Sequence, residues 1–160
     1  MNPDWPVNPD RLIAQLELEP LPDEGGLFRQ TYSDAFSTAI YFLVTSDEFS
    51  ALHRLQGAEI YHFYGGDPLQ MLLLRPDGRI ARPLLGPNFR VGQSPQLVVP
   101  GGVWQGSATT GSYSLLGTTM APSFRPEDFD LGQRDELIAS YPTAAADILR
   151  LTRDSSGADQ

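Results

Sequence analysis

Residues 53–66 read His-Arg-Leu-Gln-Gly-Ala-Glu-Ile-Tyr-His-Phe-Tyr-Gly-Gly, and this window contains both histidines of the 160-residue chain. Strand-like residues stand on each side of Gln56-Gly57-Ala58, a pattern that predicts two strands joined by a short hairpin. Imidazole titrates near neutral pH and is the side chain most often used for proton transfer. The window therefore predicts a β-rich fold and locates the candidate functional site.

Segments of strand length recur on both sides of this window. Each is apolar or alternating, is rich in β-branched or aromatic residues, and is separated from the next by Gly, Pro, Asn or Asp. They cover 27–32, 38–45, 49–55, 59–64, 69–74, 96–99, 103–108 and 113–120. Eight or nine short strands without a helical period between them predict an all-β protein, built as an antiparallel sandwich or barrel.

The two ends of the chain have a helical character. Residues 8–10, Asn-Pro-Asp, form a helix-start signal for a short amphipathic helix. Residues 126–152 are expected to hold two short helices, broken at Pro142, that pack back on the sheet. We expect a single domain over residues 1–152 and a flexible tail over residues 153–160.

The composition excludes several classes of function. All 11 basic residues are arginine, the net charge is −9 and there is no cysteine. Such a chain lacks the clustered positive charge that nucleic acid or an anionic membrane requires. Lysine chemistry, disulfides and cysteine metal sites are also excluded. The N-terminus carries no signal-peptide pattern and no segment reaches the length of a membrane span, so we expect a cytoplasmic protein.

Strand parity sorts the side chains of the window. His53 points to one face of its strand and Ser50 to the other. In the next strand, Glu59 and Tyr61 share a face and His62 lies on the opposite one. A short hairpin would then bring His53 beside Glu59, where the carboxylate can orient the imidazole.

The spacing resembles the first motif of the cupin proteins. That motif has a glycine, two histidines one residue apart, a glutamate four residues later and a closing glycine. His53, Glu59 and Gly66 match the motif, whereas Leu55 stands in place of the second histidine and Asp47 in place of the opening glycine. The window therefore resembles the cupin motif but lacks part of its ligand set.

The second cupin motif is also recognisable. Pro100 and Gly102 match it, and Gln105 stands where the motif has histidine. Longer stretches resemble a cupin subfamily of unknown function; they are 23–32, 37–43, 49–54, 59–64, 99–105 and 120–124. The resemblance implies a double-stranded β-helix, or jelly roll, that forms a homodimer and belongs to the group that holds the deoxysugar epimerases. It implies no particular substrate.

Three residues are our candidates for catalysis. The epimerases that the chain resembles use a histidine base and a tyrosine acid. By that analogy His53 is the base, Glu59 orients it and Tyr61 is the acid. The expected reaction is a metal-independent isomerisation or epimerisation of a small polar molecule, sugar-like or nucleotide-sugar-like, that is bound in the barrel.

Three further residues are candidates for ligand binding. Gln105 would position the bound molecule through its amide, and His62 is a second candidate on the neighbouring strand. Arg29 is suited to hold a phosphate or carboxylate at the pocket mouth.

A metal site is the main alternative for the same residues. Catalytic zinc or non-haem iron generally takes three protein ligands, and this chain supplies His53 and Glu59 with a third only if His62 joins them. We therefore expect no cofactor. Two other functions stay open: a non-catalytic binding or structural cupin, and a metal-dependent enzyme that uses His53, Glu59 and His62.

Overall fold

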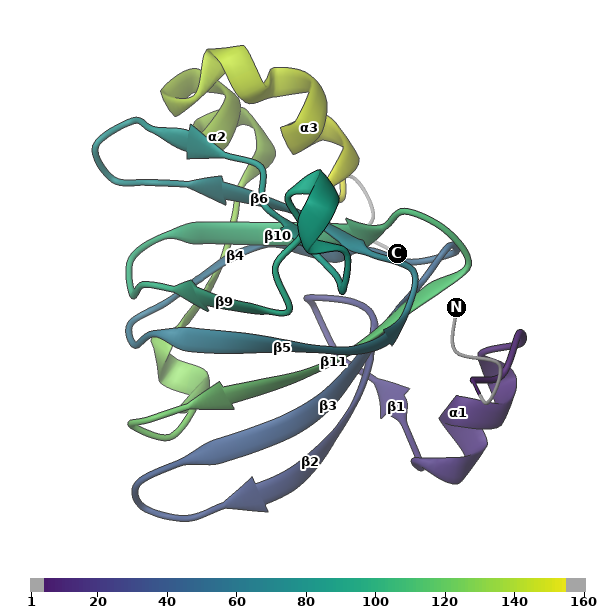
Figure 1. Ribbon diagram of the computed structural model, residues 1–160. Coiled ribbons are helices and arrows are strands. Elements are labelled where there is room, and N and C mark those ends of the chain that lie inside the picture. Colours follow the sequence, from purple (N-terminus) through teal and green to yellow (C-terminus); the bar gives the residue numbers. More distant parts are fainter. Residues whose placement is uncertain (1–4, 155–160) are drawn as a thin grey trace.

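Two antiparallel sheets lie face to face in the computed structural model, which describes residues 5–154 (Figure 1). The first sheet has the order β1-β2-β3-β11-β5-β9, formed by Glu19–Pro20, Leu27–Ser33, Thr38–Thr45, Tyr113–Met120, Glu59–Gly66 and Gln96–Val99. The second has the order β12-β4-β10-β6-β7, with β8 also paired to β6; its strands are Phe129–Leu131, Ser50–Leu55, Trp104–Thr109, Leu69–Leu74, Ile80–Ala81 and Leu84–Leu85. The predicted all-β jelly roll is confirmed.

Every strand predicted from the sequence is present, with ends that differ by at most two residues. The pattern did not predict β1, β7, β8 and β12, which have only two or three residues. A period of two cannot be recognised in so short a segment.

Short helices stand at the two ends of the described chain. The first is α1, Asp10–Gln15, and the Asn8 side chain accepts a hydrogen bond from the Asp10 backbone at 2.9 Å. Two more, α2 at Arg134–Ser140 and α3 at Ala145–Arg150, cover the second sheet (Figure 1). Single turns of 3-10 helix lie at Phe89–Val91, Pro126–Asp128 and Pro142–Ala144. None of the described helices is long and apolar enough to cross a membrane.

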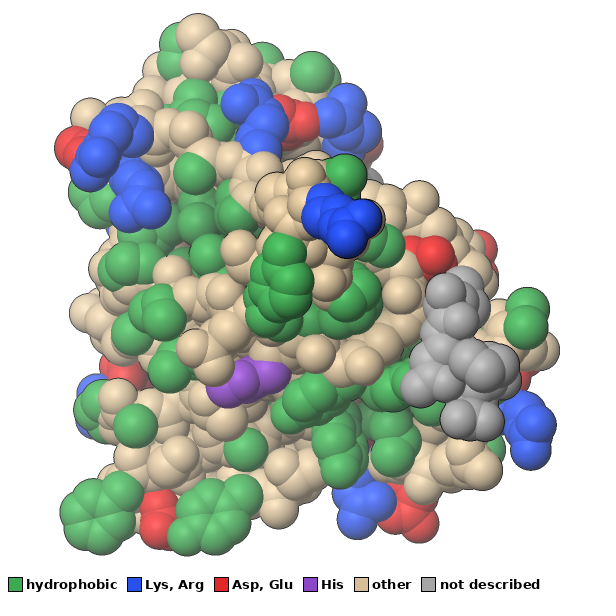
Figure 2. Space-filling view, in the orientation of Figure 1, with side chains coloured by type: hydrophobic (Ala, Val, Ile, Leu, Met, Phe, Trp, Pro, Cys, Tyr) green, Lys and Arg blue, Asp and Glu red, His purple; other side chains and the backbone are tan. Residues whose placement is uncertain are grey.

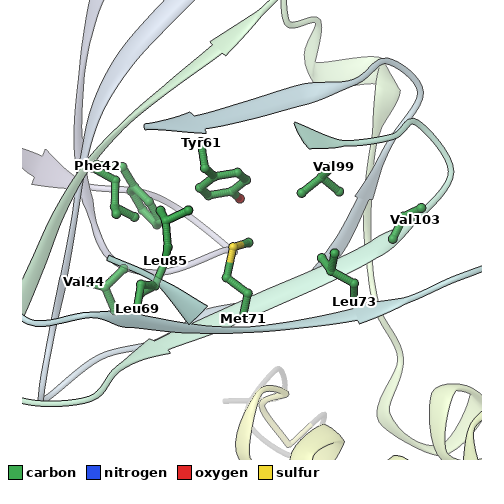
Figure 3. Close-up of a cluster of buried hydrophobic side chains, with 10 residues drawn as sticks. Phe42, Val44, Tyr61, Leu69, Met71, Leu73, Leu85, Val99 and Val103 are labelled. Carbon is green, nitrogen blue, oxygen red and sulfur yellow. The ribbon is translucent and has the colours of Figure 1, made fainter. Parts of the chain in front are cut away.

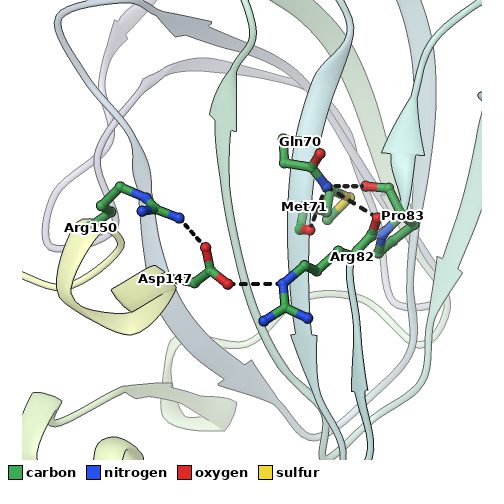
Figure 4. A network of polar contacts seen from close by, with 6 residues as sticks. All are labelled: Gln70, Met71, Arg82, Pro83, Asp147 and Arg150. Atoms are coloured by element: carbon green, nitrogen blue, oxygen red, sulfur yellow. Dashed lines mark hydrogen bonds and ion pairs between the residues drawn. The ribbon is translucent and has the colours of Figure 1, made fainter. Parts of the chain in front are cut away.

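The outer face of the second sheet is buried by α2 and α3. Leu72 and Leu74 of β6 pack there against Leu137 and Ile148 of these helices. An ion-pair network at the surface links α3 to the β7–β8 segment, since the Asp147 carboxylate accepts from both Arg82 and Arg150 (Figure 4). Exposed ion pairs each contribute about 1 kcal/mol or less, so the apolar contacts stabilise this layer most.

The inner faces of the sheets form a second core, which fills part of the barrel (Figure 3). Alternate residues of β6, Leu69, Met71 and Leu73, point inward and pack with Phe42 and Tyr61 from the first sheet. Burying one such side chain contributes roughly 1.5–3 kcal/mol. Because this core occupies only part of the interior, the remaining space between the sheets is open.

The last described residues pack against the barrel. Arg153 donates to the backbone carbonyls of Asp23 and Glu24 at 3.2 and 3.1 Å, and Asp154 accepts from Arg134. Residues 155–160 of the predicted tail lie outside the described residues, and the domain boundary at residue 152 stays a prediction.

Candidate functional site

A cavity of about 320 Å³ opens between β2, β3 and β11 of the first sheet and β4 and β12 of the second. Its walls are mainly apolar, formed by Leu21, Pro22, Phe28, Ile40, Leu55, Met120, Phe124, Pro126 and Phe129. The polar lining consists of Gln30, Thr38, Thr118 and three carboxylates, Asp23, Glu24 and Glu59. Among the described residues that line it there is no arginine. The site is therefore an apolar hollow with a negatively charged region, at the usual position of a ligand in a small barrel.

A glycine turn places Glu24 in this cavity. The Glu24 carbonyl accepts from the Ala51 backbone at 2.8 Å, and its carboxylate accepts from the Ser50 hydroxyl at 2.8 Å. Gly25 follows with φ +93, where an added Cβ would lie 2.5 Å from the Phe49 carbonyl oxygen. Only glycine combines this backbone conformation with such a close approach. The turn therefore fixes Glu24 against β4.

His53 lies directly behind Glu24 and is only 1% exposed. Its Nε2 atom is 3.4 Å from Oε1 of Glu24, and its Nδ1 atom is 2.7 Å from the Ala51 carbonyl oxygen. A carbonyl can only accept, so Nδ1 must carry a proton and Nε2 faces the carboxylate. The imidazole also stacks on Phe129, with the ring centroids 5.3 Å apart. The His53 ring is thus held by Phe129 and the Ala51 carbonyl, with Nε2 directed at Glu24.

Burial raises the pKa of Glu24 above its ordinary value. His53 opposes this rise, the negative charge of Glu59 reinforces it, and the Ser50 hydrogen bond and Arg153 lower the pKa by smaller amounts. The burial penalty is the largest of these effects, because an ionised carboxylate loses hydration. Glu24 therefore holds a proton more readily than an exposed glutamate does.

Glu59 is the second buried acid of the cavity, with 9% exposure. Its Oε1 atom has no hydrogen-bond partner among the described residues. Tyr61, the next inward residue of β5, donates to Oε1 of Gln105 at 2.5 Å. Burial, and then the charges of Glu59 and Glu24, raise the pKa of Tyr61 well above its ordinary range; its hydroxyl also lies within hydrogen-bonding reach of Glu59. Tyr61 is thus a neutral donor, and its short contact goes to Gln105.

The structure pairs His53 with Glu24 rather than with Glu59, the partner expected from the sequence. Glu24 lies in a loop before β2, and no spacing rule connects it to His53. The available signal was the acidic pair Asp23-Glu24 before the Gly25-Gly26 turn, since such a turn can direct a side chain inward. Gln105 is the register partner of His53 across β4 and β10, so these two motif positions do lie side by side.

Strand parity predicts the wrong face for the Ser50 side chain. It was expected on the face opposite His53, yet both side chains reach Glu24. The β4–β10 register changes from His53 opposite Gln105 to Ser50 opposite Ser107, so three steps on β4 match two on β10. Such a bulge inserts one residue into the strand, so the side chains that precede it point to the opposite face from the one that a simple count gives.

His62 and Arg29 do not line the cavity. The His62 ring contacts the Thr119 hydroxyl at 2.9 Å and the Gln96 amide at 3.4 Å, on the outer face of the first sheet. Arg29 points outward from β2 and pairs with Glu17 at 2.5 Å.

Exposed rings of Tyr32 and Phe36 lie near the tip of the β2–β3 hairpin, where Figure 2 shows hydrophobic side chains at the lower edge of the view.

The residues present do not fit the metal centre of a cupin. Leu55 brings an apolar side chain to the cavity in place of the second histidine, and Gln105 is bonded to Tyr61 in place of the last. The alternative ligand set fails because His62 lies on the opposite face of the sheet from Glu59. Across residues 5–154, no three His, Asp or Glu side chains group as metal ligands.

Solved structures share this fold over nearly the whole chain. A crystal structure of a protein from Shewanella oneidensis has 33% identity and a TM-score of 0.87, covering 94% of this chain and 100% of that one. A hypothetical protein from Leishmania major has 28% identity and a TM-score of 0.86, covering 92% and 99%. A cupin 2 conserved barrel domain protein from Rhodopseudomonas palustris has 14% identity and a TM-score of 0.60, covering 86% and 90%, which supports the fold alone.

A search of curated proteins found no match. The model of one family, described as "Cupin superfamily (DUF985)", matches residues 10–132. The matched region contains both sheets, the Glu24 turn and every residue of the cavity. The chain therefore belongs to this family of the cupin superfamily.

Proposed function

We propose that this protein binds a small sugar-like molecule inside the barrel and moves a proton on it without a metal ion, as an isomerase or epimerase does. The observation that carries the proposal is the contact of Glu24 with both the cavity and His53. A carboxyl group that lines a cavity and contacts a buried imidazole has the composition of a general acid–base pair.

Glu24 takes the role of base that the sequence suggested for His53. Glu24 lines the cavity, whereas His53 is 1% exposed and lies behind it. As a carboxylate, Glu24 would remove a proton from a carbon next to a carbonyl and leave an enolate. Return of the proton to a carbon gives the isomer, so the reaction balances without a co-reactant. His53 is then a positioning residue that adjusts the proton affinity of Glu24.

The cavity favours a ring without phosphate groups over a nucleotide sugar. Sugar hydroxyls can donate to Glu24 and Glu59, and a ring face can pack against Phe28 or Phe129. A diphosphate would instead meet carboxylates, with no lining arginine to neutralise it. We therefore propose an unphosphorylated sugar-like ligand.

Isotope exchange tests this proposal. A thermal-shift screen of neutral monosaccharides, with their phosphates as controls, should identify ligands that raise the melting temperature. Each ligand is then incubated with protein in deuterium oxide and examined by NMR for deuterium next to its carbonyl. Glu24→Gln should abolish exchange and retain binding, whereas Glu17→Gln, at an exposed position outside the cavity, should retain both. Binding without exchange in the wild-type protein would favour the second candidate, a non-catalytic binding cupin.

The homodimer and the cytoplasmic location stay predictions. Light scattering of the purified protein should give twice the mass of 17.6 kDa if the dimer forms.

A further inference from the structure

The Glu59 side chain lines the cavity, and its enclosed Oε1 atom has no hydrogen-bond partner within the described part of the chain. Glu59 is 9% exposed, so water does not replace the missing partner freely. An unpaired buried acceptor costs about 1–3 kcal/mol, and more when it is charged. The Glu59 carboxylate therefore needs a hydrogen-bond donor that the protein itself does not supply.

The neighbouring side chains do not provide that donor. Tyr61 has a single hydroxyl hydrogen, and its 2.5 Å contact is to Gln105. His53 faces Glu24, and its other nitrogen is bonded to the Ala51 carbonyl. Arg153, whose charge acts on Glu24, contacts backbone carbonyls and pairs with Glu48 outside the cavity. None of these groups neutralises Glu59.

All the ionisable side chains that line the cavity are acidic. Asp23 at the mouth, Glu24 and Glu59 all contribute carboxylates, and His53 can offset only one of them. The chain as a whole carries a net charge of −9. A cation entering this low-dielectric hollow gains attraction, while an anion is repelled.

We infer that the natural ligand carries a protonated amine that donates to the Glu59 carboxylate while its ring or carbon body packs on the apolar wall. This inference rests on the proposed function, and it narrows the ligand from sugar-like to amino-sugar-like or a related cyclic amine. An ammonium group has three donors, which suits an acceptor without a partner. The rings of Phe28, Phe124 and Phe129 add cation–π attraction of about 0.5–2 kcal/mol where their faces are presented.

Three probes with the same carbon body and different charge test the inference: cyclohexylamine, cyclohexanol and cyclohexanecarboxylate. They are titrated at neutral pH into protein with isotope-labelled methionine methyl groups. Met120 lines the cavity and reports entry, whereas Met71 lies in the filled core and is the internal control. Cyclohexylamine should shift the Met120 signal with at least about tenfold higher affinity than cyclohexanol, and cyclohexanecarboxylate should not bind.

Variants separate this inference from the function on which it rests. Glu59→Gln should lower the affinity for cyclohexylamine to that for cyclohexanol, whereas Glu17→Gln, which removes the same charge at an exposed site, should leave both affinities unchanged. Equal binding of the amine and the alcohol by the wild-type protein would overturn the amine inference and leave cavity binding intact. If a monosaccharide shifts Met120 and none of the three probes does, the amine inference is contradicted and cavity binding stands; if no compound shifts it, both are contradicted.

Discussion

The Nε2 atom of His53 lies 3.4 Å from the Oε1 atom of Glu24, and this contact joins the first cupin motif to a loop that the motif does not include. Because Nδ1 of His53 donates to the Ala51 carbonyl, the shared proton can lie only between Nε2 and the carboxyl group. The carboxyl end of this histidine–glutamate pair lies in the cavity.

The Ser50 hydroxyl should stabilise this pair measurably. Ser50→Ala removes a 2.8 Å hydrogen bond to a buried carboxylate and should lower the free energy of unfolding by about 1–2 kcal/mol. Ser107→Ala is a matched control. Ser107 is the register partner of Ser50 on the neighbouring strand, is equally buried and has no hydrogen-bond partner in the described residues. Chemical denaturation should show little change for Ser107→Ala. Equal losses in the two variants would contradict the role of Ser50.

The Gly25 turn should tolerate no side chain. Gly25→Ala combines φ +93 with a Cβ 2.5 Å from the Phe49 carbonyl oxygen, whereas Gly78→Ala has φ +92 and open space. The Gly78 variant should lose about 1 kcal/mol from the backbone conformation alone, and the Gly25 variant clearly more. Thermal denaturation of both variants isolates the cost of the close approach. Similar losses would show that the turn adjusts without strain.

The pH dependence of stability should report the raised pKa of Glu24. A carboxyl group with a higher pKa in the folded than in the unfolded state binds its proton more tightly when folded. Its contribution to stability is therefore complete below its ordinary pKa of 4.5 and declines as the pH rises toward the folded value. The wild-type protein should lose stability relative to Glu24→Gln across that interval, measured by urea denaturation.

Asp34 supplies a control with the opposite sign. Hydrogen bonds from the Tyr32 hydroxyl and from the backbone N–H groups of Phe36 and Ser37 lower the pKa of Asp34 below its ordinary 3.8. The wild-type protein should lose stability relative to Asp34→Asn as the pH falls below that value. If Glu24→Gln showed the same sign as Asp34→Asn, the raised pKa of Glu24 would be refuted.

Glu59→Gln should stabilise the ligand-free protein. The substitution removes a buried charge whose Oε1 atom lacks a partner, and it preserves the size of the side chain. We expect a gain of about 1 kcal/mol in the free energy of unfolding, because the desolvation cost of a neutral amide is smaller. Differential scanning calorimetry measures the change. A lower melting temperature would mean that the carboxylate is satisfied in the ligand-free protein.

Two substitutions should give this chain a metal centre like that of other cupins. Protein purified without chelator should contain less than about a tenth of an equivalent of transition metal, because its ligand set is incomplete. The double variant Leu55→His and Gln105→His supplies the two imidazoles that the cupin motifs have at these positions, one on the strand of His53 and one on the neighbouring strand, and should bind about one zinc ion. Metal analysis by mass spectrometry provides the measurement. A third substitution, His53→Ala, should reduce that occupancy.

Local patterns were sufficient to predict the strands but not the contacts between distant segments. The alternation in segments such as 69–74 is a property of the strand itself, so it identified β6 without knowledge of its partners. His62 was expected opposite Glu59 for the same reason, and the structure places its ring on the outer face of the sheet.

The site depends on long-range packing and on one extra residue. Glu24 reaches His53 because a loop folds against β4, and loop positions carry no period. Ser50 faces the cavity side because a bulge reverses the parity of β4, and a count along the strand cannot detect a bulge. These two features account for the difference between the expected His53–Glu59 pair and the observed arrangement.

The contact of Arg153 with the backbone of Asp23 and Glu24 joins segments that are 130 and 129 residues apart in the sequence. The ribosome produces the turn 129 residues before the arginine, so the barrel strands can pair while the turn still lacks this support. A chain interrupted before Arg153 would contain every described strand and the contacts of Glu24 with Ser50 and Ala51, but not the contact with Arg153. The turn is therefore expected to gain its full support only after all the described strands have been synthesised.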